Sequence, residues 1–113
     1  MIEILWFCEN STEFFCVASA CRQNFVLLDA LLGRKRVARC KYDVEGSERE
    51  AIEGSARTIR EDKPDLLISL YHRTEDLHEL ILQVKALCPE YRLYVRRYPY
   101  IPAWDLNLYA TVR

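Results

Sequence analysis

Residues 37–48 have the sequence VARCKYDVEGSE and contain the change from a predicted strand to a predicted helix on which the fold assignment depends. Their apolar and β-branched residues predict a strand over residues 37–44. Gly46 permits the tight turn that must follow this strand. Ser47, with Glu50 three residues later, forms the capping-box pattern of a helix N-terminus. The stretch therefore predicts a strand that leads directly into a helix.

The helix that begins near Ser47 is predicted to stop before Pro64, because a proline biases the residue before it to extended geometry. Its apolar stripe is narrow and consists of Ile52, Ala56 and Ile59 at helical spacing. The Glu and Arg residues between them are expected to face water.

A second strand and helix follow along the chain. Residues 66–71 form an almost unbroken apolar run, which predicts a strand covered on both faces, as in a parallel sheet. Thr74 is predicted to cap the next helix, and Pro89 marks its end. Apolar residues recur along this helix at helical spacing and form its predicted buried stripe: Leu77, Leu80, Ile81, Val84 and Leu87.

The C-terminal part predicts two more strands, at residues 92–98 and 106–112. The order of strands and helices predicts right-handed crossovers and a parallel sheet, with the last two strands as an antiparallel hairpin. The N-terminal part leaves alternatives open. Residues 4–8 and 14–18 are candidate strands, and residues 25–32 are either a strand or a short helix.

Composition limits the kinds of partner. The chain has 113 residues, of which 50% are hydrophobic, and a formal net charge of -1. These values predict one folded domain and exclude intrinsic disorder. The five cations among residues 34–41 are predicted to form a solvated loop rather than a phosphate-binding patch, because no aromatic residues are interleaved with them. We therefore expect no nucleic-acid partner.

The cysteines and the N-terminus indicate the compartment. The five cysteines are odd in number and include no C-x-x-C pair, which is typical of reduced thiols in a cytoplasmic protein. Zinc binding is disfavoured, because His72 and His78 lack partners at the usual ligand spacing. The sequence shows neither a secretory signal nor an apolar run long enough to span a membrane, so no membrane partner is expected.

Residues 41–48, KYDVEGSE, resemble the K-x-D-V-E-G-x-E signature of the FkbM family of S-adenosylmethionine-dependent methyltransferases. The similarity continues at residues 28–32, 64–72, 75–77, 91–96 and 107–110, so that about 85 residues are covered. The resemblance implies an α/β fold, namely the C-terminal half of a Rossmann-like class I methyltransferase fold. Parallel strands, flanking helices and a terminal antiparallel hairpin belong to that fold. The implied reaction is O-methyl transfer from S-adenosylmethionine to a sugar, lipid or polyketide-like acceptor.

The chain departs from the family in one respect that concerns the cofactor. Family members carry a glycine-rich turn that holds S-adenosylmethionine, whereas the three glycines here, Gly33, Gly46 and Gly54, form no G-x-G. We therefore expect a truncated or remnant methyltransferase that is inactive alone and binds this cofactor weakly, with no cofactor-binding residues assigned. The alternative is a non-catalytic remnant or protein-interaction module without a cofactor.

This expectation divides the chain in two. Residues 25–113 are expected to be a partial FkbM-type methyltransferase domain, and residues 1–24 an N-terminal segment whose structure the sequence leaves open. The family's sheet would place the strand over residues 37–44 in the middle. Its second edge is then expected to pair with a strand from residues 1–33, or otherwise to cause self-association.

Three residues are the candidate catalytic groups. Asp43 and Glu45 end one predicted strand and His72 follows the next, so they should meet at the edge where open α/β sheets bind ligands. The resemblance implies that one of them takes the proton of an acceptor hydroxyl, or that together they hold a divalent cation that acidifies the acceptor. We assign all three as catalytic and none as a metal ligand. The structural alternative is that Asp43 and Glu45 cap the helix and that His72 bonds local backbone.

Overall fold

The computed structural model describes residues 2–8, 14–20, 28–44, 46–97 and 106–113. Strands and helices alternate through most of this part of the chain. In chain order they are β1 (Ile2–Cys8), β2 (Phe14–Ala20), α1 (Leu28–Leu32), β3 (Val37–Asp43), α2 (Glu48–Glu53), α3 (Ala56–Asp62), β4 (Asp65–Ser69), α4 (Asp76–Leu87), β5 (Arg92–Arg97) and β6 (Leu106–Thr111).

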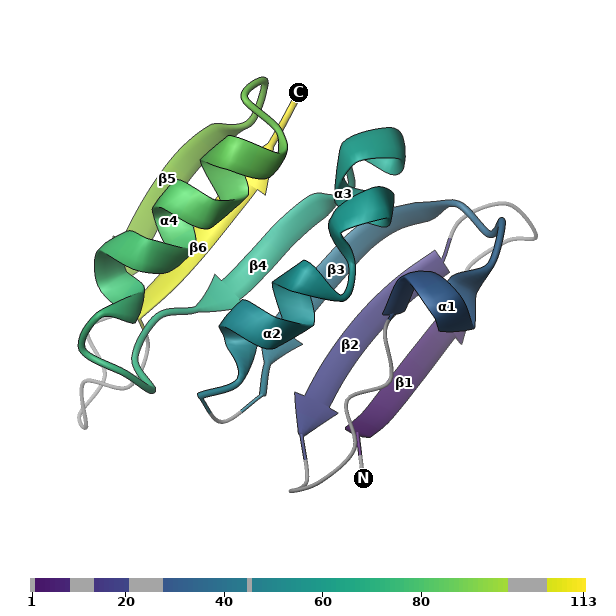
Figure 1. Ribbon diagram of the computed structural model, residues 1–113, viewed down its shortest axis with the longest axis horizontal. Coiled ribbons are helices and arrows are strands. Elements are labelled where there is room, and N and C mark those ends of the chain that lie inside the picture. The colour runs from purple at the N-terminus through teal and green to yellow at the C-terminus, as the bar shows by residue number, and fades with distance from the viewer. Residues whose placement is uncertain (1, 9–13, 21–27, 45, 98–105) are drawn as a thin grey trace.

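The described strands form one sheet in the order β1-β2-β3-β4-β6-β5 (Figure 1). β2, β3 and β4 are mutually parallel, as the crossover helices require, whereas β6 runs antiparallel to both β4 and β5. The predicted α/β class, with parallel strands and a terminal antiparallel hairpin, is therefore confirmed.

The N-terminal strands complete the sheet on its other side. β2 pairs with β3 in parallel, with Cys16 opposite Cys40 and Ala18 opposite Tyr42, and β1 pairs with β2 in antiparallel fashion. The expectation that residues 1–33 supply a strand for the second edge of β3 is thus confirmed. α1 shows that the helical alternative applies to residues 28–32, while residues 25–27 lie outside the described part of the chain.

The helix predicted from Ser47 to Pro64 is in fact two helices, α2 and α3, so the prediction of one continuous helix is wrong. The break lies at Ser55, which is fully buried. Its hydroxyl bonds the backbone oxygens of Ala51 at 2.8 Å and Ile52 at 3.2 Å, and so satisfies carbonyls at the end of α2.

The predicted capping box is also wrong. Ser47 makes no side-chain cap hydrogen bond, and the backbone N–H of Val44 donates instead to Oε1 of Glu48 at 3.0 Å. α3 is capped from a distant element: Asp29 of α1 accepts the backbone N–H groups of Arg57 at 2.8 Å and Thr58 at 2.9 Å.

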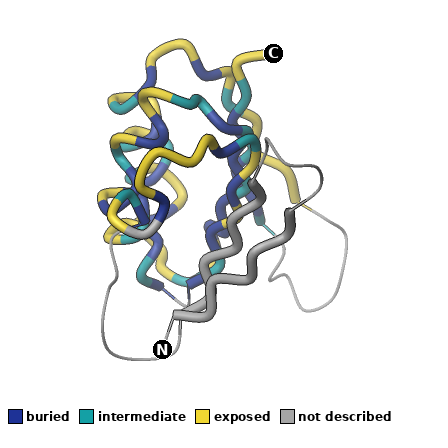
Figure 2. The backbone as a smooth tube through the Cα atoms, turned by 90° about the vertical axis from the view of Figure 1, so that its right-hand side faces the viewer, coloured by how far each residue is buried: buried dark blue, intermediate teal, exposed yellow. Residues whose placement is uncertain are grey.

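The described helices all lie on one face of the sheet, and the hydrophobic core lies between the two layers (Figure 2). On α4, Leu80 and Val84 are fully buried, but Leu77 is 47% exposed, so the predicted stripe is one residue too long. Thr74 does not cap this helix, because its N-cap position is Glu75 and no side-chain cap bond forms there.

β4 alternates more than its sequence suggests. Leu66, Ile68 and Leu70 are buried in the core, whereas Leu67 is only half-buried and Tyr71 is 36% exposed. The strand predicted to be covered on both faces is fully covered on the helix side. Its other face is covered only in part, since Leu67 is half-buried although Ser69 is buried.

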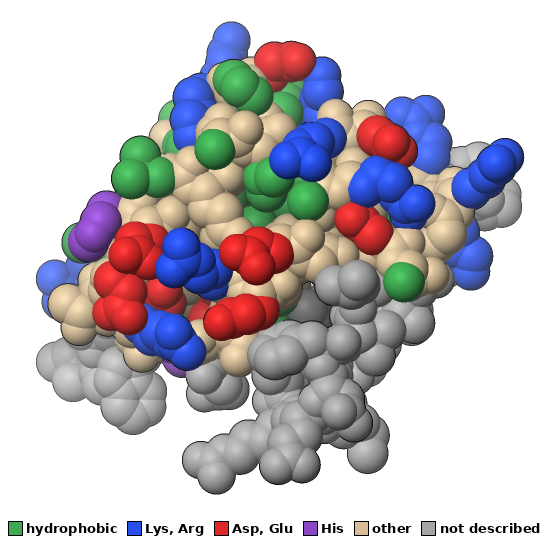
Figure 3. All heavy atoms as spheres, in the orientation of Figure 1, with side chains coloured by type: hydrophobic (Ala, Val, Ile, Leu, Met, Phe, Trp, Pro, Cys, Tyr) green, Lys and Arg blue, Asp and Glu red, His purple; other side chains and the backbone are tan. Residues whose placement is uncertain are grey.

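The surface of the helix layer mixes both charges. Acidic side chains lie among Lys and Arg side chains over this face (Figure 3). Arg49, for example, lies 3.3 Å from Glu79 and 3.9 Å from Glu53. None of the helices that the structure describes has both the length and the apolar character needed to cross a membrane.

Candidate functional site

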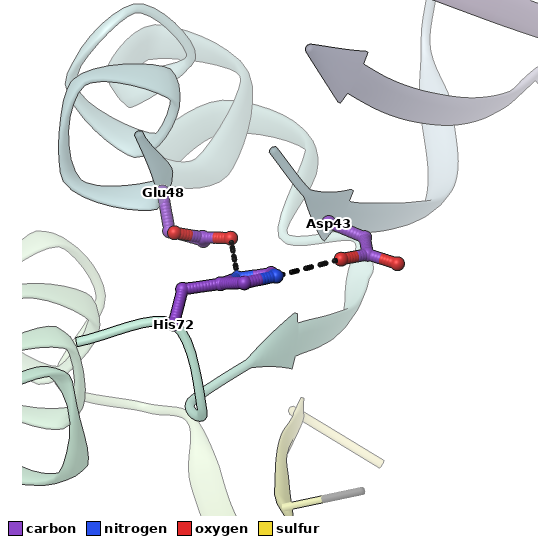
Figure 4. A group of neighbouring side chains, drawn as sticks. All are labelled: Asp43, Glu48 and His72. Atoms are coloured by element: carbon purple, nitrogen blue, oxygen red, sulfur yellow. Dashed lines mark hydrogen bonds and ion pairs between the residues drawn. The ribbon is translucent and has the colours of Figure 1, made fainter. Parts of the chain in front are cut away.

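The candidate site lies where two parallel strands end. Tyr42 of β3 stands opposite Ile68 of β4, so the carboxyl ends of these strands are adjacent. Asp43 is the last residue of β3, and His72 lies in the turn after β4. The two side chains approach each other from these neighbouring ends (Figure 4). This is the edge at which open α/β sheets bind ligands.

His72 is held from the inside by Glu48. Nδ1 of the imidazole lies 2.6 Å from Oε1 of this carboxylate, and Glu48 is fully buried as the first residue of α2. Because a carboxylate only accepts, Nδ1 carries the proton in this bond and Nε2 is turned to the other side of the ring. Glu48 thereby fixes both the tautomer and the orientation of the imidazole.

On the other side of the ring stands Asp43. Its Oδ1 lies 3.5 Å from Nε2 of His72, and the Tyr71 hydroxyl donates to the same oxygen at 3.3 Å. The side chain of Asp43 is 32% exposed, against 11% for His72. The site is therefore closed at Glu48 and open to solvent at Asp43.

Gly46 provides the turn that places Glu48 opposite His72. Its φ of +96° lies in the region that favours glycine. A Cβ at this position would lie 3.4 Å from Nε of Arg73 and 3.8 Å from Cβ of His72. The glycine is thus needed for its backbone conformation and lies against the loop that carries His72.

Two buried carboxyl groups give the site an excess of acidic oxygen. Oε2 of Glu48 and Oδ2 of Asp76 are both buried without a hydrogen-bond partner among the described residues. Burial raises the pKa of Asp76, the negative charge of Glu48 raises it further, and Arg73 opposes both effects. Asp76, only 4% exposed, begins α4 close behind the site.

The sequence located this site only in part. The structure brings Asp43 and His72 together as predicted, whereas Glu45 lies outside the described residues. Sequence reasoning missed Glu48, the residue that holds His72 most closely. Its position as an acid in the first turn after the strand was the available signal. One ligand atom from each of Asp43, Glu48 and His72 lies within 4.8 Å of the others, so this group has the composition of a metal site.

The comparisons agree with this architecture. A mixed α/β sheet with a histidine and carboxylates at the carboxyl ends of its parallel strands does not by itself define an enzyme class, and the sequence match indicates the methyltransferases. The family model of the methyltransferase FkbM domain matches residues 23–101. The chain therefore belongs to the FkbM methyltransferase domain family.

A solved structure supports the same assignment. The methyltransferase FkbM from Methylobacillus flagellatus KT is 36% identical to the chain and aligns with a TM-score of 0.69. The match covers 74% of this chain and 22% of that chain, so the chain spans less than a quarter of the length of its solved relative. No curated protein matches the chain.

The family implies S-adenosylmethionine, and the described residues do not fit it. A backbone that approaches this cofactor closely needs glycine at a strand-to-helix turn. Of the three glycines, Gly46 alone lies at the carboxyl edge of the sheet, and it is a single glycine against which Arg73 and His72 lie. Gly33 lies at the end of α1 and Gly54 at the end of α2. The described part of the chain therefore offers no cradle for the cofactor.

Proposed function

We propose that this chain is an FkbM-type O-methyltransferase domain whose Asp43–Glu48–His72 group receives the hydroxyl of a small-molecule acceptor. The observation that carries the proposal is the 2.6 Å bond from Nδ1 of His72 to the buried Glu48, which leaves Nε2 at the open side of the site. A hydroxyl placed there would donate to Nε2. The acceptor is a sugar, lipid or polyketide-like molecule.

The proposed step is a proton transfer. The O–H bond of the acceptor breaks, a bond from that hydrogen to Nε2 of His72 forms, and the electron pair stays on the acceptor oxygen, which becomes the nucleophile. The charge of Glu48 stabilises the resulting imidazolium. Oδ1 of Asp43 lies 3.5 Å from Nε2, on the solvent side of the site. From there Asp43 orients the acceptor hydroxyl toward Nε2. Glu48 is thus a positioning residue, and His72 is the catalytic one.

We further propose that the 113-residue chain alone transfers no methyl group. Support comes from the glycines, none of which forms the turn that S-adenosylmethionine needs. The alternative function is a non-catalytic interaction module. The two functions differ in one measurable property: a methyltransferase domain binds a hydroxyl acceptor beside His72, and an interaction module is not expected to bind one.

Partner identity is part of the same proposal. The partner that fits the site is a small molecule with a hydroxyl group, and no nucleic acid or membrane is required. Self-association through β3 was expected only if one edge of this strand were unpaired. β2 and β4 flank the strand on both sides, so β3 has no unpaired edge. Association through an outer strand of the sheet remains a proposal, which sedimentation at several concentrations tests.

Calorimetric titration with S-adenosylmethionine and S-adenosylhomocysteine tests the cofactor part. We expect no binding in the micromolar range and no product in a radiolabel transfer assay. Micromolar binding that is lost in Asp43→Asn would overturn this part of the proposal.

Ligand-observed NMR with a panel of sugars, lipids and polyketide fragments tests the acceptor part. We expect binding that His72→Gln weakens and that His78→Gln, a change of the exposed histidine of α4, leaves intact. If the unchanged chain, His72→Gln and His78→Gln all bind the acceptor equally, or if none of them binds it, the result contradicts the proposed site and favours the interaction module.

A further inference from the structure

The site also has the geometry of a cation site with two inner ligands and an outer partner. We infer that Nε2 of His72 and a carboxylate oxygen of Asp43 bind a divalent transition-metal cation, with Glu48 holding the imidazole from behind. This inference rests on the acceptor site of the proposed function and changes how that site works: the cation would lie where the acceptor hydroxyl is received, and it would take over from Nε2 the task of making that hydroxyl acidic.

The distance between the two proposed ligands fits a shared cation. Nε2 of His72 and Oδ1 of Asp43 are 3.5 Å apart, which is longer than the usual N–H···O hydrogen bond. Two ligands at bond lengths of about 2.1 Å from a tetrahedral zinc ion are themselves about 3.4 Å apart. The observed separation therefore fits two ligands of one cation with little movement of either side chain.

The other ring nitrogen of His72 has the kind of partner that metal-binding histidines have. Histidines that bind metals almost always donate their second N–H to a carboxylate, a carbonyl or water, which fixes the ring and raises its basicity. Glu48 makes this contact with Nδ1 at 2.6 Å and is fully buried. The carboxylate–histidine part of a carboxylate–histidine–metal arrangement is thus already formed.

The charges around His72 are unbalanced. The fully buried Glu48 bonds Nδ1 of His72 on one side of the ring and Asp43 faces Nε2 on the other, so two carboxylates flank one imidazole. With a neutral imidazole, Asp43 and Glu48 together carry the negative charge that one divalent cation balances. Arg73, a cation of the same loop, is exposed and lies against Gly46.

The ligand types select the class of cation. One imidazole nitrogen and one carboxylate oxygen suit Zn²⁺, Co²⁺ or Ni²⁺, whereas Ca²⁺ and Mg²⁺ prefer a set of oxygen ligands. The exposed side of Asp43 leaves the remaining coordination positions to water or to the acceptor. A cation there would lower the pKa of a bound hydroxyl and so replace Nε2 in making the acceptor acidic.

Titration of the chelator-treated full chain with Co²⁺, followed by its visible absorption and by calorimetry, tests the inference. Co²⁺ also reports its ligands, because thiolate ligation adds a strong near-ultraviolet band that nitrogen and oxygen ligands do not give. This control matters because the chain has five cysteines. Thermal unfolding of each variant shows that it is folded before it is titrated.

We expect saturable Co²⁺ binding without the thiolate band. Asp43→Asn and His72→Gln should each weaken it at least about 10-fold, and Glu48→Gln should weaken it by about 10- to 100-fold, the effect of losing an outer partner. His78→Gln should bind as the unchanged chain does. If Glu48→Gln fails to fold, the half-exposed Asp43 still gives a decisive variant.

Three results would overturn the inference: no binding at millimolar Co²⁺, unchanged binding in both Asp43→Asn and His72→Gln, or a thiolate band that accompanies all binding. The two proposals fail separately. Acceptor binding that depends on His72 without any Co²⁺ binding removes only the cation site. Co²⁺ binding without acceptor binding removes only the proposed function.

Discussion

Nδ1 of His72 lies 2.6 Å from Oε1 of Glu48, and this bond joins the loop after β4 to the first residue of α2. The same oxygen accepts the backbone N–H of Val44 at 3.0 Å, directly after β3. One buried carboxylate therefore connects three segments of the chain, and it sets the tautomer of the candidate base. Its removal should affect both stability and ligand binding.

Glu48→Ala should lower the free energy of unfolding by about 3 kcal/mol, because it leaves a buried N–H and a buried imidazole without their acceptor. Glu48→Gln keeps the size and one carbonyl oxygen, and should cost less than about 1.5 kcal/mol. Urea denaturation measures both. Equal losses for Ala and Gln would mean that the volume of the side chain, rather than its hydrogen bonds, is what the fold needs.

Gly46→Ala should cost about 2–3 kcal/mol, because its φ of +96° is a backbone conformation that L-residues rarely adopt. Gly33→Ala is the matched control. Its φ of +56° is also positive but matches the left-handed helical value of about +57°, which an L-residue can adopt, so a cost of about 1 kcal/mol is expected. Thermal or urea denaturation decides, and a larger loss at Gly33 would contradict the account given for the turn.

Asp29→Ala should lower the free energy of unfolding by about 1–2 kcal/mol, because Asp29 caps α3 through the N–H groups of Arg57 and Thr58. Ser47→Ala should change it by less than about 0.5 kcal/mol, since Ser47 makes no side-chain cap bond. The comparison of denaturation midpoints is direct. If Ser47→Ala lowers the free energy of unfolding and Asp29→Ala does not, the predicted capping box at Ser47 is correct after all.

Leu80→Ala should cost roughly 2–5 kcal/mol, because Leu80 is fully buried between α4 and the sheet. Leu82→Ala on the same helix should stay within about 0.5 kcal/mol, since Leu82 is 66% exposed. Both variants remove the same atoms from the same helix. Similar losses in urea denaturation would show that the two faces of α4 are assigned incorrectly.

The free energy of unfolding of Asp76→Asn should increase relative to that of the unchanged chain as the pH rises. Burial raises the pKa of Asp76 in the folded state above the ordinary value of 3.8, so the folded state binds its proton more tightly than the unfolded state. The stability contributed by this group is present below pH 3.8 and is lost as the pH rises through the folded-state pKa. The attraction of a charged Asp to the start of α4 opposes this effect without reversing its sign.

The check for Asp76 is the difference in urea midpoint between the two proteins at pH 3 and at pH 7, with a chelator present throughout. Every other titrating group is shared, so the difference reports this carboxyl group together with its interactions with Glu48, Arg73, Glu75 and His72. A difference that is the same at both pH values would show that the folded-state pKa of Asp76 is ordinary.

Local sequence signals were sufficient for the succession of elements from β3 to β6. Proline, glycine and the spacing of apolar residues act on the chain within a few residues, so they placed β3, β4, α4 and the final hairpin close to their observed bounds. The same signals placed Asp43 and His72 at neighbouring strand ends, because parallel strands end at one edge.

Tertiary structure decided which residues that are distant in the sequence form hydrogen bonds with each other. Glu48 is 24 residues from His72 in sequence, and Asp29 is 29 residues from Thr58, so no local pattern announces either pair. The break between α2 and α3 likewise depends on Ser55, whose hydroxyl lies 2.5 Å from that of Tyr42 in β3. Such bonds form only after packing has excluded water, since a buried polar group must then find its partner in the protein. The sequence by itself therefore determined the order of the elements and the edge that carries the site, and packing determined which residues hold the site together.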